Sequence, residues 1–416
     1  MTQDSPTPSA GSSGHTSREP SQARRALWQR VVSAQESGLV VVIALMMALL
    51  TIFGGSKPSP IRVDIPAGAQ AAELEGNVLE ITGPGGKSVF RSEQAWRIRD
   101  GDAEGSRVAF GSRTVNKFLD TENLVIVTTN ASYIAIMAVG MTAVIILAGI
   151  DLSIGSIYAI AAILGAMAVS YMESSAQAAG GTSGTLAAVL VLLGVCGSVG
   201  AFCGFLNGAG SVALRVHPFI ITLGTMAIYR GVVFVLTKGQ TVSGIPESIQ
   251  RGFFKFEFAH VYPVPTLIML GVALIGMFVL SQTVLGRRVY AIGGNEVAAK
   301  YAGIPVGRVK TIVYTLSGLL AGLSAAIYVG YYGAAETNAG QGYELNVIAA
   351  AVIGGASLSG GRGSALGAVL GAILVQLINN GMVILVIDQS FNQIVMGLAI
   401  ILAVVVDQTK TRLSAR

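Results

Sequence analysis

Residues 286–304 read GRRVYAIGGNEVAAKYAGI, a short charged segment that lies between long apolar runs. Asn295 is a favourable helix N-cap because its side chain accepts a hydrogen bond from a free backbone N–H group, and Glu296 suits the positive end of the helix dipole. Gly303 allows the left-handed conformation that ends many helices, and Pro305 prevents continuation. The pattern therefore predicts a helix of about two turns, which is marginal in water unless another surface holds it.

One face of this predicted helix suits contact with another protein. Val297 and Tyr301 are four residues apart and therefore lie on one side of the helix. Ala298, Ala299 and Ala302 are small enough to let a neighbouring backbone approach closely. An ordinary cytoplasmic loop explains the composition equally well, so the residues alone leave both interpretations open.

The composition is that of a membrane protein. The chain has 416 residues, of which 52% are hydrophobic and only 12% are charged, and its mean hydropathy is +0.66. Soluble domains carry about 25% charged residues, and a membrane-spanning helix needs about 20 mostly apolar residues. We therefore predict an all-α polytopic membrane protein with about ten transmembrane helices. The apolar windows are 38–53, 124–148, 152–171, 185–206, 218–236, 264–284, 310–332, 345–359, 364–386 and 391–406, and the window 345–359 is short for a span.

Basic residues predict the orientation in the membrane, because short loops that carry Lys and Arg stay on the cytoplasmic side. With alternating spans, Arg215, Arg362, Lys410 and the segment 286–309 fall on one side. The loops near 174–185 and 333–342 carry no Lys or Arg and fall on the other side. We therefore expect both termini to lie in the cytoplasm.

Two segments differ in composition from the apolar windows. The start of the segment 1–30 is rich in Ser, Thr, Pro and Gly, which predicts a disordered cytoplasmic tail. A membrane domain over 31–416 follows it. Residues 54–123 are long, polar and mixed in charge; Ile61 to Ile65 alternate like a strand, and a Gly-Pro-Gly-Gly turn at 83–86 predicts a hairpin. We predict a small β-rich periplasmic insert after the first span, with a flexible spacer as the alternative.

Polar residues also interrupt the apolar windows. Asp151 and Ser153, in the segment GIDLSIGS at 149–156, either cap the following helix or line a gate or substrate path. Asn379 and Asn380 are further candidates for the substrate path, because amide groups can both donate and accept hydrogen bonds to a polar substrate. The same candidate path includes tyrosines, although packing explains each of them as well; these are Tyr133, Tyr158, Tyr229 and Tyr328.

Small residues recur at a spacing of four. Gly200, Gly204 and Gly208 form one such series, and Gly318 and Gly322 begin another. This spacing places small residues along one stripe of a helix, where a neighbouring helix can approach closely. We interpret these stripes as packing features and not as functional sites.

Several of these segments resemble, in order, the permease subunits of bacterial ABC importers for monosaccharides of the ribose, xylose and galactose type. The resemblance covers about residues 124–408. The tail and the insert at 54–123 depart from the usual family pattern and leave the role of the outer face open. The matching segments are 140–142 (GMT), 149–156, 217–220 (HPFI) with 222–225 (TLGT), 286–304 and 352–361 (VIGGASLSGG).

The resemblance implies a multi-pass permease subunit of the bacterial inner membrane that moves sugar by alternating access. It implies that the segment matching 293–304 seats on a cytoplasmic ABC ATPase subunit; the coupling residues would be Gly294, Asn295, Glu296, Ala298, Ala299 and Gly303. Further implied partners are a periplasmic or lipid-anchored sugar-binding protein, a second permease copy as a homodimer or paralogue, and the lipid bilayer, with no nucleic acid. The chain would bind no cofactor itself, since the ATPase uses the ATP, and it would not be an enzyme.

Three alternatives fit the sequence less well. A branched-chain amino-acid permease of the same superfamily is disfavoured by the Asp-Leu-Ser element and the Gly-Gly-Asn loop. An ion-coupled secondary transporter normally needs buried carboxylates, for which only Asp151 and Glu344 qualify. A membrane-embedded enzyme is disfavoured because His, Cys and carboxylate residues are not grouped at helical spacing.

Overall fold

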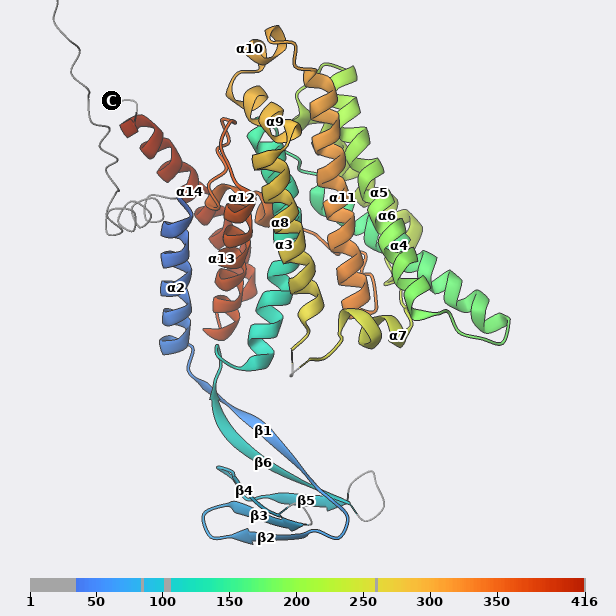
Figure 1. Cartoon of the computed structure of the whole chain (residues 1–416), viewed down its shortest axis with the longest axis vertical. Helices are drawn as coiled ribbons and strands as arrows, with labels where there is room; N and C mark the ends of the chain where they lie inside the picture. Colours follow the sequence, from blue (N-terminus) through green and yellow to red (C-terminus); the bar gives the residue numbers. More distant parts are fainter. Residues whose placement is uncertain (1–34, 84–85, 101–105, 259–260, 415–416) are drawn as a thin grey trace, which may run out of the picture.

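The computed structural model describes residues 35–83, 86–100, 106–258 and 261–414, and the predicted tail at 1–30 lies outside these residues. A body of helices carries a small β insert at one end (Figure 1). In the described part of the chain, eight helices are long and apolar enough to cross a membrane. They are α2 (Gln35–Phe53), α3 (Thr121–Ile146), α4 (Ile154–Ala178), α5 (Thr185–Ala213), α6 (Pro218–Thr237), α8 (Pro263–Gln282), α11 (Val306–Tyr332) and α13 (Ala365–Ile384).

The predicted count of about ten spans is not confirmed. The window 345–359 forms only α12 (Tyr343–Ile353), whose 11 residues extend about 16 Å against a hydrocarbon core of about 30 Å. The last window belongs to α14 (Asn392–Ser414), whose apolar stretch is shorter than a span within the described residues. The remaining helices are α7 (Glu247–Ile249), the π-helix η1 (Gln250–Phe254), α9 (Val284–Gly294), α10 (Glu296–Tyr301) and the 3-10 helix η2 (Gln389–Phe391).

The glycine stripes bring α5 and α11 into backbone contact, as the spacing predicts. A Cβ atom added at Gly200 would lie 2.2 Å from the carbonyl oxygen of Gly318, and one added at Gly318 would lie 2.2 Å from that of Gly200. Only glycine therefore fits at either position. Close backbone approach of this kind gives membrane helices many van der Waals contacts where the hydrophobic effect cannot drive association.

The β-rich insert is confirmed, and it consists of two three-stranded antiparallel sheets. Its Gly83–Gly86 hairpin forms between strands β3 (Val78–Gly83) and β4 (Gly86–Arg91), with Gly83 opposite Gly86. The insert has its own core, which includes Leu79, Trp96 and Ala109. Helix α3 begins at Thr121, two residues before the predicted end of the insert. The first sheet has the order β1 (Ser56–Ile65), β6 (Arg107–Asn116), β5 (Arg97–Asp100), and the second β2 (Gln70–Leu74), β3 (Val78–Gly83), β4 (Gly86–Arg91).

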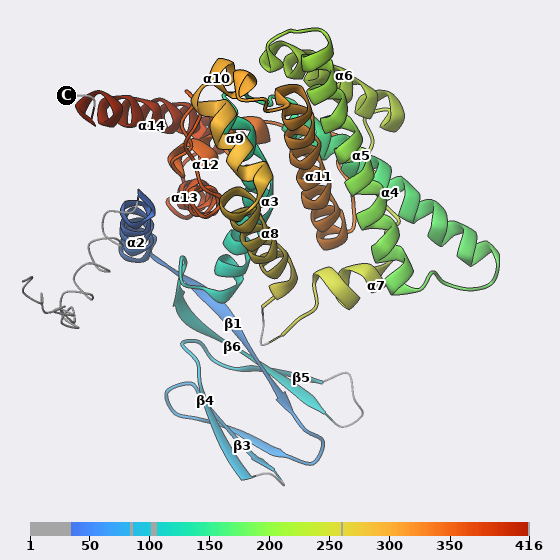
Figure 2. The ribbon, with the colours of Figure 1, turned by 45° about the horizontal axis from the view of Figure 1, so that its top comes forward.

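The insert and α10 lie at opposite ends of the helical body, which both views show (Figures 1 and 2). Helix α3 follows the insert directly and runs toward the end that carries α9 and α10. We call the end with the insert the outer end and the end with α10 the inner end.

Candidate functional site

The predicted two-turn helix is confirmed as α10, with the expected residues at both ends. The Asn295 side chain accepts a hydrogen bond from the backbone N–H of Ala298 at 2.9 Å. Gly303 is left-handed, with φ of +81°, and the N–H of Ile304 bonds to the carbonyl of Ala299 at 3.1 Å. Asn295 itself is extended, so α10 turns away from the helix before it. The preceding helix, α9, was not predicted. Its signal in the sequence is the helical spacing of two apolar residues, Val289 and Ile292, which are both buried.

The side chains of α10 divide between an exposed face and a buried one. Tyr301 is 89% exposed and Val297 is 64% exposed, so the face predicted to meet a partner is bare in this chain. Ala299 is only 4% exposed, because it packs against other parts of the chain. Gly294 and Ala298 are exposed. Glu296 makes an ion pair with Lys310 of α11 at 2.8 Å, which holds α10 against the start of that helix.

The α9–α10 unit is joined to the core through backbone contacts. The N–H of Gly361 bonds to the carbonyl oxygen of Ile146, the last residue of α3, at 2.9 Å. Gly293 lies against this bond: a Cβ there would lie 1.7 Å from the Ile146 oxygen and 2.7 Å from the Gly361 nitrogen. The Tyr290 hydroxyl donates to the carbonyl of Gly363 at 2.7 Å. Movement of α10 is thereby tied to α3 and to the turn that precedes α13.

Asp151 lies in the link between α3 and α4 and is fully buried. Its Oδ1 atom accepts hydrogen bonds from the Ser153 N–H at 2.9 Å and the Ser153 hydroxyl at 2.6 Å. The Asn207 amide donates to the Ser153 hydroxyl oxygen at 2.7 Å, and the Thr225 hydroxyl donates to Asn207 at 2.7 Å. This network joins the link to α5 and α6. The other oxygen of Asp151 has no hydrogen-bond partner among the described residues.

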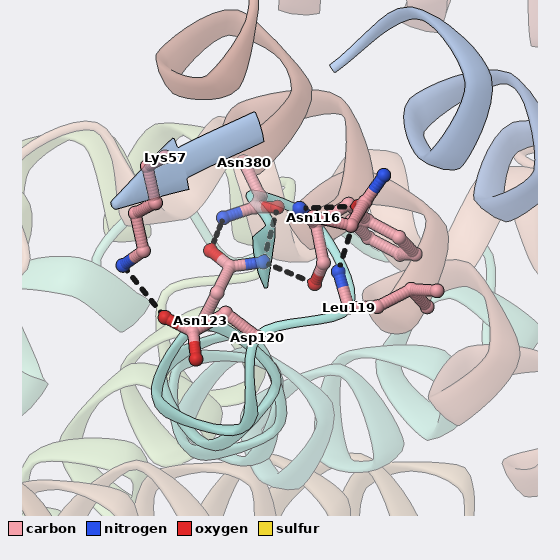
Figure 3. Close-up of polar contacts among 7 residues, drawn as sticks. Lys57, Asn116, Leu119, Asp120, Asn123 and Asn380 are labelled. Carbon is pink, nitrogen blue, oxygen red and sulfur yellow. Dashed lines mark hydrogen bonds and ion pairs between the residues drawn. The ribbon is translucent and has the colours of Figure 1, made fainter. Parts of the chain in front are cut away.

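Asn380 belongs to α13 and lies far from Asp151, beside the outer end of α3. Its amide exchanges hydrogen bonds with the Asn123 amide at 2.7 and 3.3 Å (Figure 3). Beside this pair, the Asn116 side chain accepts from the N–H groups of Phe118 and Leu119, and Lys57 pairs with Asp120 at 2.6 Å. We call this group of side chains the outer joint, because it fastens β1 and β6 to α3 and α13. The buried Asn379 Oδ1 atom has no hydrogen-bond partner among the described residues.

A cluster of tyrosines joins side chains of α3, α4 and α11. Three of the predicted path residues meet there: the Tyr328 ring centroid is 6.3 Å from that of Tyr133 and 5.6 Å from that of Tyr158. Tyr229 lies elsewhere and donates to the Cys203 carbonyl. The hydroxyls of Tyr133 and Tyr158 are buried without a hydrogen-bond partner in the part of the chain that the structure describes. Sequence reasoning missed the other members, although two of them adjoin Tyr328 at helical spacing; they are Tyr262, Tyr331, Tyr332 and Tyr343.

Comparison with known proteins relates this architecture to import permeases. The family described as branched-chain amino acid transport system / permease component matches residues 123–404. The ribose import permease of Escherichia coli (strain K12) is 40% identical over 305 residues, which cover 73% of this chain and 91% of that protein. The D-allose transport system permease of the same strain is 37% identical over 307 residues, with coverage of 72% and 87%. The fructose import permease of Rhizobium meliloti is 32% identical over 317 residues, with coverage of 74% and 84%.

No solved structure matches the chain. The family match begins at residue 123, so the β insert precedes it and the outer joint lies across its boundary. The described helices and the matches over most of the chain agree: this is a multi-pass membrane protein that belongs to the family of importer permease components, with the ribose, D-allose and fructose permeases among its relatives.

Proposed function

We propose that the chain is the transmembrane subunit of an ATP-driven, binding-protein-dependent monosaccharide importer. The observation that carries the proposal is the bare Val297–Tyr301 face of α10, because a short helix with exposed apolar side chains, firmly fixed at the inner end, suits a protein partner. The relatives are named as sugar permeases, which favours a sugar over the branched-chain amino-acid alternative. We propose that the cytoplasmic ATPase docks on this face and uses the ATP, while this chain binds no cofactor.

Sugar would reach the chain from the outer end. We propose that a periplasmic or lipid-anchored binding protein delivers it and that a second permease copy completes the pathway. Within this chain, the tyrosine cluster offers aromatic faces and two buried hydroxyls without a partner, and such groups suit the CH faces and hydroxyls of a monosaccharide. Alternating access requires two packings that the ATPase and the loaded binding protein favour differently.

The proposed orientation places the insert in the periplasm and α10 and both termini in the cytoplasm. The positions of the insert and α10 at opposite ends support it, as do the basic residues near α10. Cysteines introduced at Ser88 and Ala298, both exposed, test it in a Cys196→Ala/Cys203→Ala background. An impermeant thiol reagent applied to intact cells should label position 88 and not 298; the reverse pattern would overturn the orientation.

Tyr301→Ala tests the docking face. Its side chain is 89% exposed, so its removal leaves the fold of this chain intact. Interface aromatics that act as hot spots contribute about 2 kcal/mol or more, so we expect at least about thirtyfold weaker binding of the ATPase subunit. The measurement is retention of the ATPase during purification, together with sugar uptake.

The matched control is Tyr171→Ala, because Tyr171 is a 77% exposed tyrosine on α4. It should retain both the ATPase and uptake. If Tyr301→Ala binds the ATPase and transports like the parent, α10 is not the docking element. If uptake continues without any ATPase and depends on an ion gradient, the alternative of an ion-coupled secondary transporter replaces the proposal.

A further inference from the structure

A large basic cavity lies at the inner end, between the link that joins α5 to α6 and the start of α11. Its volume is about 1090 Å³. Four basic side chains line it, those of Arg215, Lys300, Arg308 and Lys310, against one acidic side chain, that of Glu296. Glu296 pairs with Lys310 at 2.8 Å. None of the ion pairs in the described part of the chain involves the other three, so three of the four basic groups that border the cavity have no ion-pair partner there.

An apolar stripe continues from this cavity along α11. Arg308, Ile312, Leu316, Leu319 and Leu323 follow one another at spacings of four, four, three and four residues, so they lie on one side of the helix. Ile312 is 45% exposed, and Leu316 and Leu319 are each 39% exposed. Ile312 lines the basic cavity itself. The same side of α11 is therefore cationic at its start and apolar over the following turns.

The outer part of this stripe lines a second cavity. It has a volume of about 300 Å³, lies between α3, α8, α9 and α11, and has an almost wholly apolar lining. Leu316 and Leu319 of the stripe line one wall, and Ile275 and Val279 of α8 line another. The two cavities follow one another along the same side of α11, because Ile312 of the stripe lines the first and Leu316, about one turn further on, lines the second.

We propose that the two cavities together bind one anionic phospholipid. Its phosphate would lie among Arg215, Lys300 and Arg308, and an acyl chain would follow Ile312 into the apolar groove. Basic pockets between membrane helices at the cytoplasmic surface suit anionic headgroups. The usual excess of basic residues on the cytoplasmic side explains the charges but not the apolar groove that continues from them. A free phosphate would use only the basic part.

The bound lipid would fasten the link between α10 and α11 to the membrane surface. Lys300 belongs to α10, and Arg308 lies in the first turn of α11. Anionic lipid would thereby hold the helix proposed to meet the ATPase. Uptake would then depend on the lipid composition as well as on ATP.

The test removes two of the unpaired charges without disturbing the backbone. Arg215 has a left-handed φ of +54°, a conformation that Asn tolerates, so Arg215→Asn is the suitable change there. Arg308→Gln keeps a good helix former at position 308, in the first turn of α11. The matched control is Arg287→Gln/Arg288→Gln, which removes two exposed arginines from α9, at the same end of the molecule but outside the cavity.

Purified permease in detergent is titrated with dioleoyl phosphatidylglycerol, or with dioleoyl phosphatidylcholine, and bound lipid is counted by native mass spectrometry. Each basic residue near an anionic headgroup contributes about 1 kcal/mol, so we expect about thirtyfold weaker phosphatidylglycerol binding in Arg215→Asn/Arg308→Gln. The control variant should bind phosphatidylglycerol like the parent, and the parent should bind phosphatidylcholine much more weakly.

Three results would overturn the proposal. Equal binding of phosphatidylglycerol by parent and variant, or of the two lipids by the parent, would show that the cavity does not recognise an anionic lipid. Displacement of phosphatidylglycerol by an equal concentration of inorganic phosphate would show a site for a soluble anion. Unchanged lipid binding together with loss of the ATPase subunit would assign the cavity to the ATPase interface. Because lipid binding is measured without the ATPase, its failure leaves the proposed transport function untouched.

Discussion

Helix α3 is fastened to the turn before α13 at the inner end and to α13 itself at the outer end, by different chemistry. At the inner end the bond runs between two backbones, from Gly361 to Ile146, with Gly293 packed against it. At the outer end the bond runs between two side chains, Asn123 and Asn380. The inner contact leaves no room for a Cβ atom, whereas the outer one depends on two amides that the chain separates by 257 residues.

This difference has a mechanical consequence. A junction without side chains cannot change rotamer, so it passes small displacements from α10 directly to α3 and α13. The amide pair can break and reform when water replaces its two hydrogen bonds, because each contributes about 1 kcal/mol net. We therefore expect the inner junction to be stiff and the outer joint to be adaptable. The following changes test that expectation.

Gly293→Ala should have the largest effect. A Cβ there would lie 1.7 Å from the Ile146 oxygen, so α9 must move away from α3. Overpacking costs about 1–3 kcal/mol and occasionally more, and a backbone oxygen cannot rotate aside, so we expect roughly 3 kcal/mol or more. The measurement is thermal unfolding of the purified permease together with uptake. Gly294→Ala is the matched control, because a Cβ at Gly294 meets nothing within 4 Å. Equal stability of the two variants would contradict a stiff inner junction.

Asn123→Ala should have an intermediate effect. It leaves the Asn380 amide, which is 6% exposed, without its partner, and an unsatisfied buried amide costs about 1–3 kcal/mol. The measurement is a double-mutant cycle with Asn380→Ala, in which interacting residues show a coupling of about 0.5–3 kcal/mol. Additive losses, with no coupling, would show that the pair does not hold the outer joint together.

Lys57→Ala should have the smallest effect. Its partner is Asp120 at 2.6 Å, but the Lys57 side chain is 38% exposed, and exposed ion pairs contribute about 0.2–1 kcal/mol. The hydrogen bond to Asp120 raises the pKa of Lys57 above its ordinary value of 10.5. The pair's contribution is therefore fully present below pH 10.5 and is lost as the pH rises through the raised pKa. A stability loss as large as that of Gly293→Ala would reverse the proposed order of the two joints.

Much of the membrane architecture follows from local composition. Eight of the predicted apolar windows form helices long enough to span a membrane, because about 20 apolar residues in lipid have no stable alternative to a helix. The hairpin around Gly83 and Gly86 and the helix between Asn295 and Gly303 were also predicted correctly. Turn and cap residues act on their immediate neighbours, so their effects can be read along the chain.

Contacts between residues that are far apart in the sequence could be found only from the tertiary structure. The window 345–359 is apolar enough to suggest a span, yet α12 ends at Ile353, where Gly354 packs against the Gly367 backbone of α13. Ala299 is as small as Ala298 in the sequence, but only Ala299 is covered by the rest of the chain. The amide of Asn380 is chemically suited to bind a sugar, which is what the sequence suggested. Its pairing with Asn123 depends on how α3 and α13 pack and could not be predicted from the sequence. The sequence by itself determined the eight long apolar helices and both ends of α10. The packing of those helices decided which of their side chains face a partner, because burial depends on neighbours far away in the chain.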